Sequence, residues 1–460
     1  MRRWIAGIAL VLLVLACSLG AAALVWMAAR QIAPSGPPLE ATLPPPTPTP
    51  SEPRSVPTPS TPTPSPTADQ TFDAIARLVE GLRGLKATGP YTRALMTQAE
   101  LRAYQKKKFE ENYTPEEARR DTLTLAAFDL LPRDFPLRDF LLDLYTEQIA
   151  GFYDPDTKQF FVISDREAPG ILERVTFAHE YTHLLQDQHF DLVALGFTDD
   201  ERKRPKDLSD DAMLARRALV EGDATLTQLL YLSRLPPAER RQWLEAVQSQ
   251  PSPVFDRAPR VIREELTFPY DQGFAFVQRL FEEGGWDAVN AAFRDPPAST
   301  EQIMHPEKYR LHEAPIRVSL PPLTDTLGSG WHIADENVLG EFFLKVYLEE
   351  RLAPDQAERA AAGWGGDRYA VYVNEGAGQD LLVLWLAWDN ADEAAEFVEA
   401  YRAYAVERYG HGPAREAPGQ ATWVGTDVLR LEWQDAHVLI LRGPDEALLQ
   451  RVRARIPFPR

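Results

Sequence analysis

The sequence predicts an α+β protein, in which an N-terminal transmembrane helix and a stalk precede a mainly helical domain with a small sheet and then a smaller α+β domain. Three observations predict this order. The chain opens on an uncharged apolar run, a proline-rich stretch follows, and the remaining pattern changes from helical to strand-rich near residue 325. The 460 residues suffice for two folded domains of ordinary size.

Residues 4–29 form the apolar run of 26 residues, WIAGIALVLLVLACSLGAAALVWMAA. At about 1.5 Å per residue, a helix of this length can cross a hydrocarbon core of about 30 Å. Arg2 and Arg3 precede the run, and the positive-inside rule then favours a cytoplasmic N-terminus. We therefore expect residues 1–33 to be the signal anchor of a single-pass cell-membrane protein whose later residues are extracytoplasmic.

Two other export routes remain open. Cys17 follows Ala16 and could carry the lipid of a lipoprotein, although Leu15 fits that motif poorly. A cleaved signal peptide would instead give a secreted protein. Cys17 is also the single cysteine, which excludes an intrachain disulfide framework and a cysteine-rich zinc module. Any metal site must therefore use histidines and carboxylates.

Residues 34–67 contain 14 of the 39 prolines, interleaved with serine and threonine. This composition cannot bury a core and favours extended polyproline II, so we expect a disordered stalk. At about 3.1 Å per residue, the stalk could hold the next domain up to roughly 100 Å from a membrane. The folded part should begin near Ala68.

Residues 68–324 carry a mainly helical pattern with well-marked helix starts. Capping boxes at Thr97–Glu100 and Thr114–Glu117 mark two of these starts. The stretch 151–164 reads GFYDPDTKQFFVIS and predicts a hairpin, because turn residues separate two aromatic-rich runs. This domain should therefore combine many helices with a small sheet.

Residues 325–460 change to a strand-rich pattern and predict the α+β C-terminal domain. The expected elements are strands at 368–373 and 380–388, a helix at 391–409 that ends at Gly410, two strands around 427–442 and a closing helix. No motif in this domain suggests chemistry, and its apolar strands are typical of a core.

The charge balance excludes one class of partner. Acidic residues outnumber basic ones 68 to 49, for a net charge of -19. Binding to a phosphate backbone requires a basic surface, which this composition does not offer. We therefore expect no nucleic-acid partner.

One helix carries the residues that predict chemistry, in the segment VTFAHEYTHLL. His179 and His183 are one helical turn apart, so their imidazoles project from the same face and can chelate one metal ion. Glu180 lies beside them, where it can serve as the base for an activated water. The other positions of this segment are uncharged, which predicts a buried helix. Core histidines satisfied by backbone carbonyls are the structural alternative.

A zinc site needs a third protein ligand, and the sequence offers two. Glu221 is a lone glutamate in an apolar-periodic helix, where it needs a partner; an ion pair with Arg216 or Arg217 is the structural alternative. His189 follows the second motif histidine at the spacing of the HExxHxxGxxH class. Gln186, however, stands where that class has a turning glycine. Glu221 is therefore the preferred ligand.

HEYTH followed some forty residues later by EGDAT resembles the Glu-zincin (gluzincin) group of zinc metallopeptidases. More narrowly, EQIAGFYDPDTKQFFV, HEYTHLLQDQHFDL, ALVEGDAT and STEQIMHPEKY are similar to a poorly characterised bacterial group of membrane-anchored or secreted metallopeptidases. These stretches span about residues 145–310. The resemblance implies that residues 68–324 form a zincin-like metallopeptidase domain.

The resemblance also implies a set of roles. His179, His183 and Glu221 would bind Zn²⁺, and Glu180 would be the catalytic base. Many Glu-zincins place an Asp four residues after the ligand Glu to orient a ligand histidine. That position is Thr225 here, so the support of the histidine is in question.

Other parts of the site are less sharply marked. His305 is a candidate catalytic residue as donor to the oxyanion, with Tyr309 and Tyr270 as rivals. In zincins an edge strand pairs with the substrate, and Gln159–Ser164 is the expected strand from its order in the chain.

The sequence thus predicts an extracytoplasmic, membrane-tethered zinc peptidase that hydrolyses peptide bonds of a peptide or protein substrate by zinc-activated water, with Glu180 as general base. Ferritin-like di-iron chemistry would need a second ExxH, which the chain lacks. The remaining alternative is a non-catalytic, stalked cell-surface binding module with a structural metal site.

Overall fold

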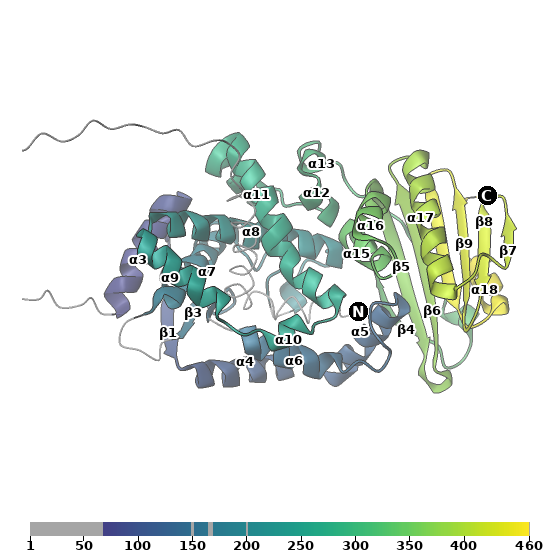
Figure 1. Cartoon of the computed structure of the whole chain (residues 1–460), viewed down its shortest axis with the longest axis horizontal. Helices are drawn as coiled ribbons and strands as arrows, with labels where there is room; N and C mark the ends of the chain where they lie inside the picture. Colours follow the sequence, from purple (N-terminus) through teal and green to yellow (C-terminus); the bar gives the residue numbers. More distant parts are fainter. Residues whose placement is uncertain (1–67, 149–150, 164–168, 199–200, 460) are drawn as a thin grey trace, which may run out of the picture.

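The computed structural model describes residues 68–148, 151–163, 169–198 and 201–459 (Figure 1). The predicted anchor at 1–33 and the predicted stalk at 34–67 lie outside these residues. Within the described ranges, no helix is both long enough and apolar enough to cross a membrane. The described chain is a mixed α+β structure, in which helices and a three-stranded sheet precede a seven-stranded sheet.

Four helices surround the predicted metal-binding residues. They are α3 (Ala68–Arg83), α7 (Ile171–Phe190), α8 (Asp210–Arg234) and α11 (Arg260–Arg294). Helix α8 packs along α11 and also contacts α7, while α3 contacts α7 and α8 (Figure 1). The other helices before the large sheet are α4 (Gln98–Asn112), α5 (Pro115–Ala127), α6 (Leu137–Gln148), α9 (Pro237–Gln248), α10 (Pro253–Asp256), α12 (Thr300–Met304), α13 (Pro306–Arg310) and α14 (Thr324–Leu327). The mainly helical pattern is confirmed.

The contact between α8 and α11 depends on a pair of glycines. A Cβ atom added at Gly222 would lie 2.2 Å from the carbonyl oxygen of Gly273, and one added at Gly273 would lie 2.2 Å from that of Ala218. The two helix backbones therefore touch, which a residue with a side chain would prevent. Because Gly222 directly follows Glu221, this contact also sets where Glu221 lies.

Both predicted capping boxes are confirmed. Thr97 and Thr114 each accept a hydrogen bond from the backbone N–H three residues later, and Glu100 and Glu117 each reach back to the cap. The boxes start α4 and α5 because each satisfies two backbone donors that a helix start leaves open.

The small sheet confirms the hairpin but corrects the expected edge strand. Its order is β1-β3-β2, with β1 at Thr92–Met96, β2 at Gly151–Asp154 and β3 at Gln159–Ile163. β3 is therefore the central strand, antiparallel to β2 and parallel to β1. The prediction that Gln159–Ser164 is an edge strand was wrong, because β1, whose residues precede their partners in β3 by 67 positions, pairs with its other side. β2 is the edge strand that contacts α7.

The seven-stranded antiparallel sheet has the order β4-β5-β6-β10-β9-β8-β7. Its strands are β4 (His332–Asn337), β5 (Trp364–Asn374), β6 (Gln379–Trp388), β7 (Arg415–Ala417), β8 (Gln420–Val424), β9 (Val428–Gln434) and β10 (His437–Gly443). The later helices are α15 (Gly340–Leu348), α16 (Pro354–Ala361), α17 (Ala391–Tyr409) and α18 (Glu446–Arg453). The predicted strands, the helix ending at Gly410 and the closing helix are confirmed. β4, β7 and β8 were not predicted.

The two faces of the large sheet bury different residues. Along β5, Tyr369 and Val371 belong to the core that includes Phe397 of α17, whereas Ala370 and Tyr372 belong to the core that includes Leu448 of α18. This alternation is what the period-2 pattern of a strand demands. Helices therefore cover both faces of the sheet (Figure 1).

The first face of the sheet shares one continuous core with the helical region. That core runs from Leu101 of α4 to Ile440 of β10, and α5 contacts β4, β5 and β6. The boundary at 324/325 stays a prediction, since no gap in the core marks it.

Asp129 joins the two regions electrostatically. It follows α5 in a left-handed conformation (φ 59°) and accepts hydrogen bonds from Arg408, Arg442 and Tyr404. Burial alone would raise its pKa, but Arg442 and Arg408 outweigh burial, so the pKa of Asp129 lies below its ordinary value of 3.8. Asp427, the second acceptor of Arg408, also has a lowered pKa for the same reason.

Replacing Asp129 by Asn should lower the free energy of unfolding by about 3 kcal/mol, because Arg442 would remain buried with less compensation. A depressed carboxyl pKa adds stability above the unfolded-state value and loses it as the pH falls. The parent should therefore lose stability below about pH 4, and the variant should lose less there. Denaturant unfolding followed by tryptophan fluorescence measures both effects.

Asp355→Asn is the matched control, because Asp355 also pairs with an arginine, Arg359, but with both side chains largely exposed. That change should shift the unfolding free energy by less than about 1 kcal/mol. Equal losses in the two variants would mean that burial of the Asp129 cluster adds nothing.

Candidate metal centre

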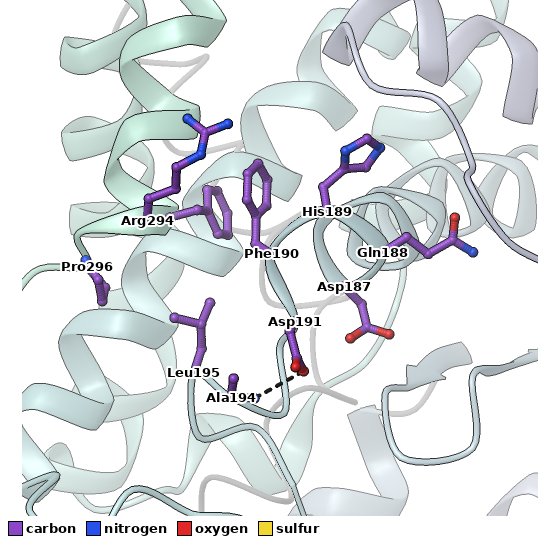
Figure 2. Close-up of a pocket in the computed structure, with 10 residues that line it drawn as sticks. Asp187, Gln188, His189, Phe190, Asp191, Ala194, Leu195, Arg294 and Pro296 are labelled. Atoms are coloured by element: carbon purple, nitrogen blue, oxygen red, sulfur yellow. Dashed lines mark hydrogen bonds between the residues drawn. The ribbon is translucent and has the colours of Figure 1, made fainter.

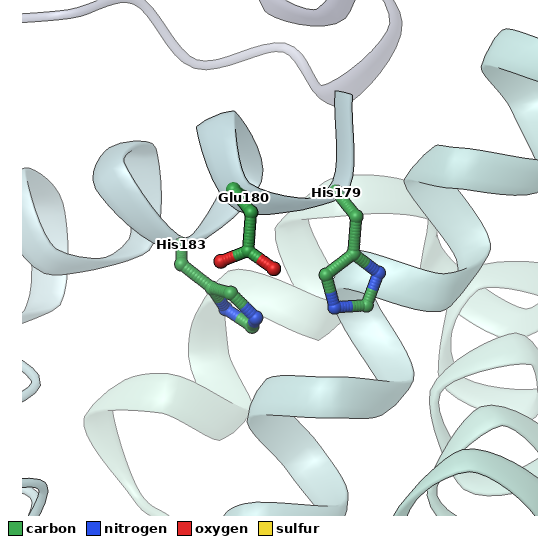
Figure 3. Close-up of side chains that lie close together, drawn as sticks. All are labelled: His179, Glu180 and His183. Carbon is green, nitrogen blue, oxygen red and sulfur yellow. The ribbon is translucent and has the colours of Figure 1, made fainter. Parts of the chain in front are cut away.

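Helix α7 presents His179, Glu180 and His183 on one side (Figure 3). Val175 to Asp187 are buried without interruption, as the uncharged pattern predicted. The two imidazole rings are fully buried, with centroids 4.8 Å apart, and Glu180 lies between them. Ligand atoms of these three residues lie within 4.8 Å of one another, which is close enough to hold one metal ion.

Glu221 approaches the two histidines from α8. Its Oε2 atom lies 3.2 Å from Nε2 of His179 and 3.5 Å from Nε2 of His183. A tetrahedral zinc ion with bonds of about 2.0–2.1 Å holds its ligand atoms roughly 3.3 Å apart. The Glu221 carboxylate therefore already lies from each imidazole nitrogen at about the spacing that zinc requires.

The lack of hydrogen bonds to two of the candidate ligand atoms also fits a metal ion. Nε2 of His183 and Oε1 of Glu221 are buried and have no hydrogen-bond partner among the described residues. Burial would raise the pKa of Glu221, but His183 and His179 outweigh burial and lower it to about 2. Burial would lower the pKa of His183, but Glu221 and Glu180 raise it to about 9. The centre thus stabilises a positive charge where the three side chains meet.

The outer nitrogen of each imidazole is held by a glutamine. Nδ1 of His179 lies 3.2 Å from Oε1 of Gln228, and Nδ1 of His183 lies 2.8 Å from Oε1 of Gln186. An amide oxygen can only accept, so each Nδ1 carries the proton and each Nε2 keeps a lone pair for a metal. Such contacts orient ligating histidines.

Thr225 replaces the Asp that orients a ligand histidine in many Glu-zincins, and these two glutamines orient the histidines instead. Neither glutamine was identified from the sequence. Gln228 lies seven residues after Glu221, two helical turns along the same face of α8. Gln186 was considered only as a departure from a glycine. Spacing from Glu221 could have identified Gln228, but no local signal identifies Gln186.

Gln186 is itself held by a second set of contacts. Its Nε2 donates to the carbonyl oxygen of Val220 and to Oδ2 of Asp223. Asp223 forms a fully buried ion pair with Arg83 of α3, at 2.7 Å. Arg83 also donates to Asn290 of α11. Helices α3, α8 and α11 therefore jointly fix the orientation of one histidine ring.

Glu180 is positioned by the edge strand β2. The backbone N–H of Tyr153 donates to Oε2 of Glu180 at 2.9 Å, and the Tyr153 hydroxyl donates to Asp187 at 2.7 Å. Lys158 also donates to Asp187, at 2.6 Å. Burial raises the pKa of Glu180 above its ordinary value; the two histidines oppose this shift, and Glu221 adds to it. A carboxylate with a raised pKa takes up a proton more readily.

His189 lies outside this centre, which corrects the second ligand hypothesis. α7 continues past Gln186 to Phe190, and the capping residue Asp191 that follows adopts the left-handed conformation (φ 57°). His189 Nε2 lies 2.8 Å from the carbonyl oxygen of Lys86. Figure 2 shows His189 beside Phe190 on a surface cavity of about 550 Å³, which none of the three convergent side chains lines.

The structure does not bring His305 to the centre either. Its Nε2 lies 2.9 Å from Oε1 of Glu341 in α15, and Figure 1 shows α12 and α13 beside α15 and α16 rather than beside α7. Tyr309 donates to the carbonyl oxygen of Asp295. The expectation of a catalytic His305 is therefore not supported by its contacts, while Tyr270 lies buried in α11, next to α8.

The ion-pair alternative for Glu221 is not what the structure contains. Arg216 donates to the carbonyl oxygen of Leu195, and Arg217 has no hydrogen-bond partner in the described part of the chain. Glu221 contacts the two histidines instead.

Comparisons with known proteins give one family match and one similar solved structure. Residues 329–453 match a family model described as a domain of unknown function (DUF8575). That match includes the large sheet and none of the residues of the metal centre. No curated protein matches. A solved structure titled a "putative hydrolase with a novel fold", from Chloroflexus aurantiacus, is similar with a TM-score of 0.34 and 16% identity over 53% of this chain and 88% of that one.

Proposed function

We propose that this protein is a zinc-dependent peptidase whose centre is His179, His183 and Glu221, with Glu180 as general base. One observation carries the proposal. Two imidazole Nε2 atoms and one carboxylate converge at zinc spacing, while both Nδ1 atoms are held by amide oxygens. Glu180 lies beside these groups and is held by a backbone N–H.

The residues of the centre divide the work of hydrolysis. A bound zinc ion would lower the pKa of a water molecule and polarise the scissile carbonyl. Glu180 would accept a proton from the attacking water and deliver it to the leaving amine, for which its raised pKa is suited. Tyr153 keeps the Glu180 carboxylate facing the two imidazoles. Metal-assisted hydrolysis of an amide bond needs these functions together.

The substrate in this proposal is an extended peptide or protein segment. β2 is an edge strand of the small sheet, and it carries Tyr153, which holds the base. An extended peptide beside that edge would find backbone groups to pair with. β2 thus takes the place that the sequence had assigned to Gln159–Ser164.

We also propose that the peptidase acts outside the cytoplasm. Residues 4–29 would anchor it in the cell membrane, and residues 34–67 would space it from the surface. Lipid attachment at Cys17, or secretion, are the other routes to the same compartment.

The proposal predicts about one zinc ion per chain in the full-length protein purified in detergent, together with cleavage of a mixed peptide library. Removing the metal with a chelator should abolish cleavage, and adding zinc back should restore it. Metal analysis and mass spectrometry of the library measure the two quantities. A chain that binds zinc but cleaves no peptide would favour the non-catalytic binding module with a structural metal site, and a chain with neither zinc nor cleavage would contradict the proposal.

A further inference from the structure

Arg217 is a buried cation to which no hydrogen bond or ion pair is made within the described part of the chain. Its side chain is 1% exposed, and none of its three guanidinium nitrogens has a hydrogen-bond partner among the described residues. A guanidinium keeps its charge in proteins and carries five N–H donors. Burying it with all donors unsatisfied is costly, so the position calls for an acceptor that binds there.

Arg217 lies one helical turn before a residue of the metal centre. It precedes Glu221 by four residues on α8, so the two side chains lie on the same face of the helix, one turn apart. The negative charges that act on Arg217 are those of Glu265 on α11 and, more weakly, Glu221. Arg204 adds a second positive charge nearby.

Glu265 is the acidic side chain with the strongest electrostatic effect on Arg217, but no hydrogen bond or ion pair joins the two. It is 1% exposed, and its Oε1 has no hydrogen-bond partner in the described residues. Burial raises the pKa of Glu265 to about 7, and Arg217 offsets only part of that rise. The donors of Arg217 therefore remain open to another carboxylate.

We propose that Arg217 binds a carboxylate of the peptide substrate, one or two residues from the bond that is cleaved. The planar guanidinium matches a carboxylate through two parallel hydrogen bonds. Arg217 and Glu221 are separated by one helical turn, which is about 5.4 Å long. An extended peptide advances about 3.3–3.6 Å per residue, so this separation corresponds to one or two substrate residues. The inference rests on the peptidase function proposed above.

Two sources can supply the carboxylate. The C-terminus of the substrate would make the enzyme remove terminal residues. An Asp or Glu side chain would instead give an acidic preference within a chain. Both sources use the same contact with Arg217, so the experiment must separate them.

The test measures peptide binding to the full-length chain in detergent, with zinc bound and Glu180→Gln introduced so that no peptide is consumed. Isothermal titration would compare one peptide with a free C-terminus, its C-terminal amide, and the amide carrying one internal Glu. We expect one of the two carboxylate peptides to bind about 30-fold more tightly than the neutral amide, as a charge-assisted hydrogen bond allows. Arg217→Met should remove this preference. Arg217→Lys should weaken it about tenfold, since Lys keeps the positive charge but lacks the planar pair of N–H donors that matches a carboxylate.

Arg216→Met is the matched control, because Arg216 donates to a backbone carbonyl, that of Leu195. It should leave the carboxylate preference unchanged. A preference that survives Arg217→Met, or a parent that binds all three peptides equally, would overturn the proposal. If Arg217→Met does not fold, Arg217→Lys decides the question alone.

Zinc content and cleavage of the amidated peptide by the chain with Glu180 intact are measured separately. Zinc and cleavage without any carboxylate preference would remove only the role of Arg217. Loss of both zinc and cleavage from the parent would remove the proposed function itself.

Discussion

A Glu180→Gln chain is expected to keep one zinc ion and to cleave peptides on the order of 10³-fold more slowly than the parent. Glutamine has the shape of glutamate and can still accept the hydrogen bond from the Tyr153 backbone. It cannot take up a proton at neutral pH. The proton transfers to and from the substrate would therefore lose their carrier, while the two histidines and Glu221 stay in place.

The measurement pairs kcat for the best peptide of the library with zinc content. Glu173→Gln is the matched control, because Glu173 lies in the first turn of the same helix, two turns before His179 and Glu180. We expect it to cleave at the parent rate. Cleavage by Glu180→Gln at more than about a tenth of the parent rate would contradict the role of Glu180 as general base.

Glu221→Gln should have its largest effect on the metal. A neutral amide is a poorer ligand than a carboxylate, and the two positively polarised imidazole sites would lose the charge that faces them. We expect zinc affinity to fall more than 100-fold, beyond the 10- to 100-fold typical of losing a residue that only orients a ligand. Activity should fall with zinc occupancy and recover in part at high zinc.

Competition with a zinc-sensitive chelator dye measures the affinity. Glu245→Gln, an exposed position on α9, is the control and should bind zinc as the parent does. Gln228→Ala gives an intermediate case, because it removes only the contact to Nδ1 of His179. If Glu221→Gln bound zinc no more weakly than Gln228→Ala, Glu221 would be an orienting residue rather than a ligand.

Elements with local signals were predicted well from the sequence. The capping residues Thr97 and Thr114 start their helices because each cap is completed within four residues. The hairpin β2–β3 follows from turn chemistry between two short runs, and α17 ends at Gly410 as expected. β4, β7 and β8 escaped prediction, since β7 is an exposed three-residue strand and each depends on a neighbour for its pairing.

The core of the candidate site was also predictable. The spacing of His179 and His183 places both imidazoles on one face of a helix, whatever surrounds it. Glu221 was recognisable as a lone acid in an apolar helix, and a buried acid needs a partner. The sequence by itself therefore determined which groups could meet.

Only the tertiary structure decided how those groups are held. The packing of α8 on α7 brings Gln228 to His179 across 49 positions of the chain. Because α7 continues past Gln186, His189 lies away from the metal centre, and Gln186 orients the His183 ring. Pairing with β1 made β3 a central strand.

Long-range packing also explains why the partners of Arg217 and His305 could not be predicted from the sequence. Whether a charged side chain finds a partner depends on which helices pack against its own, and that information is distributed over distant segments. His305 forms a contact with Glu341 of α15, whereas Arg217 is buried and has no hydrogen-bond partner among the residues that the structure describes. Residue types and short spacings thus determined the chemistry available to this protein. Long-range packing decided which residues orient the centre and which group is left to bind a substrate.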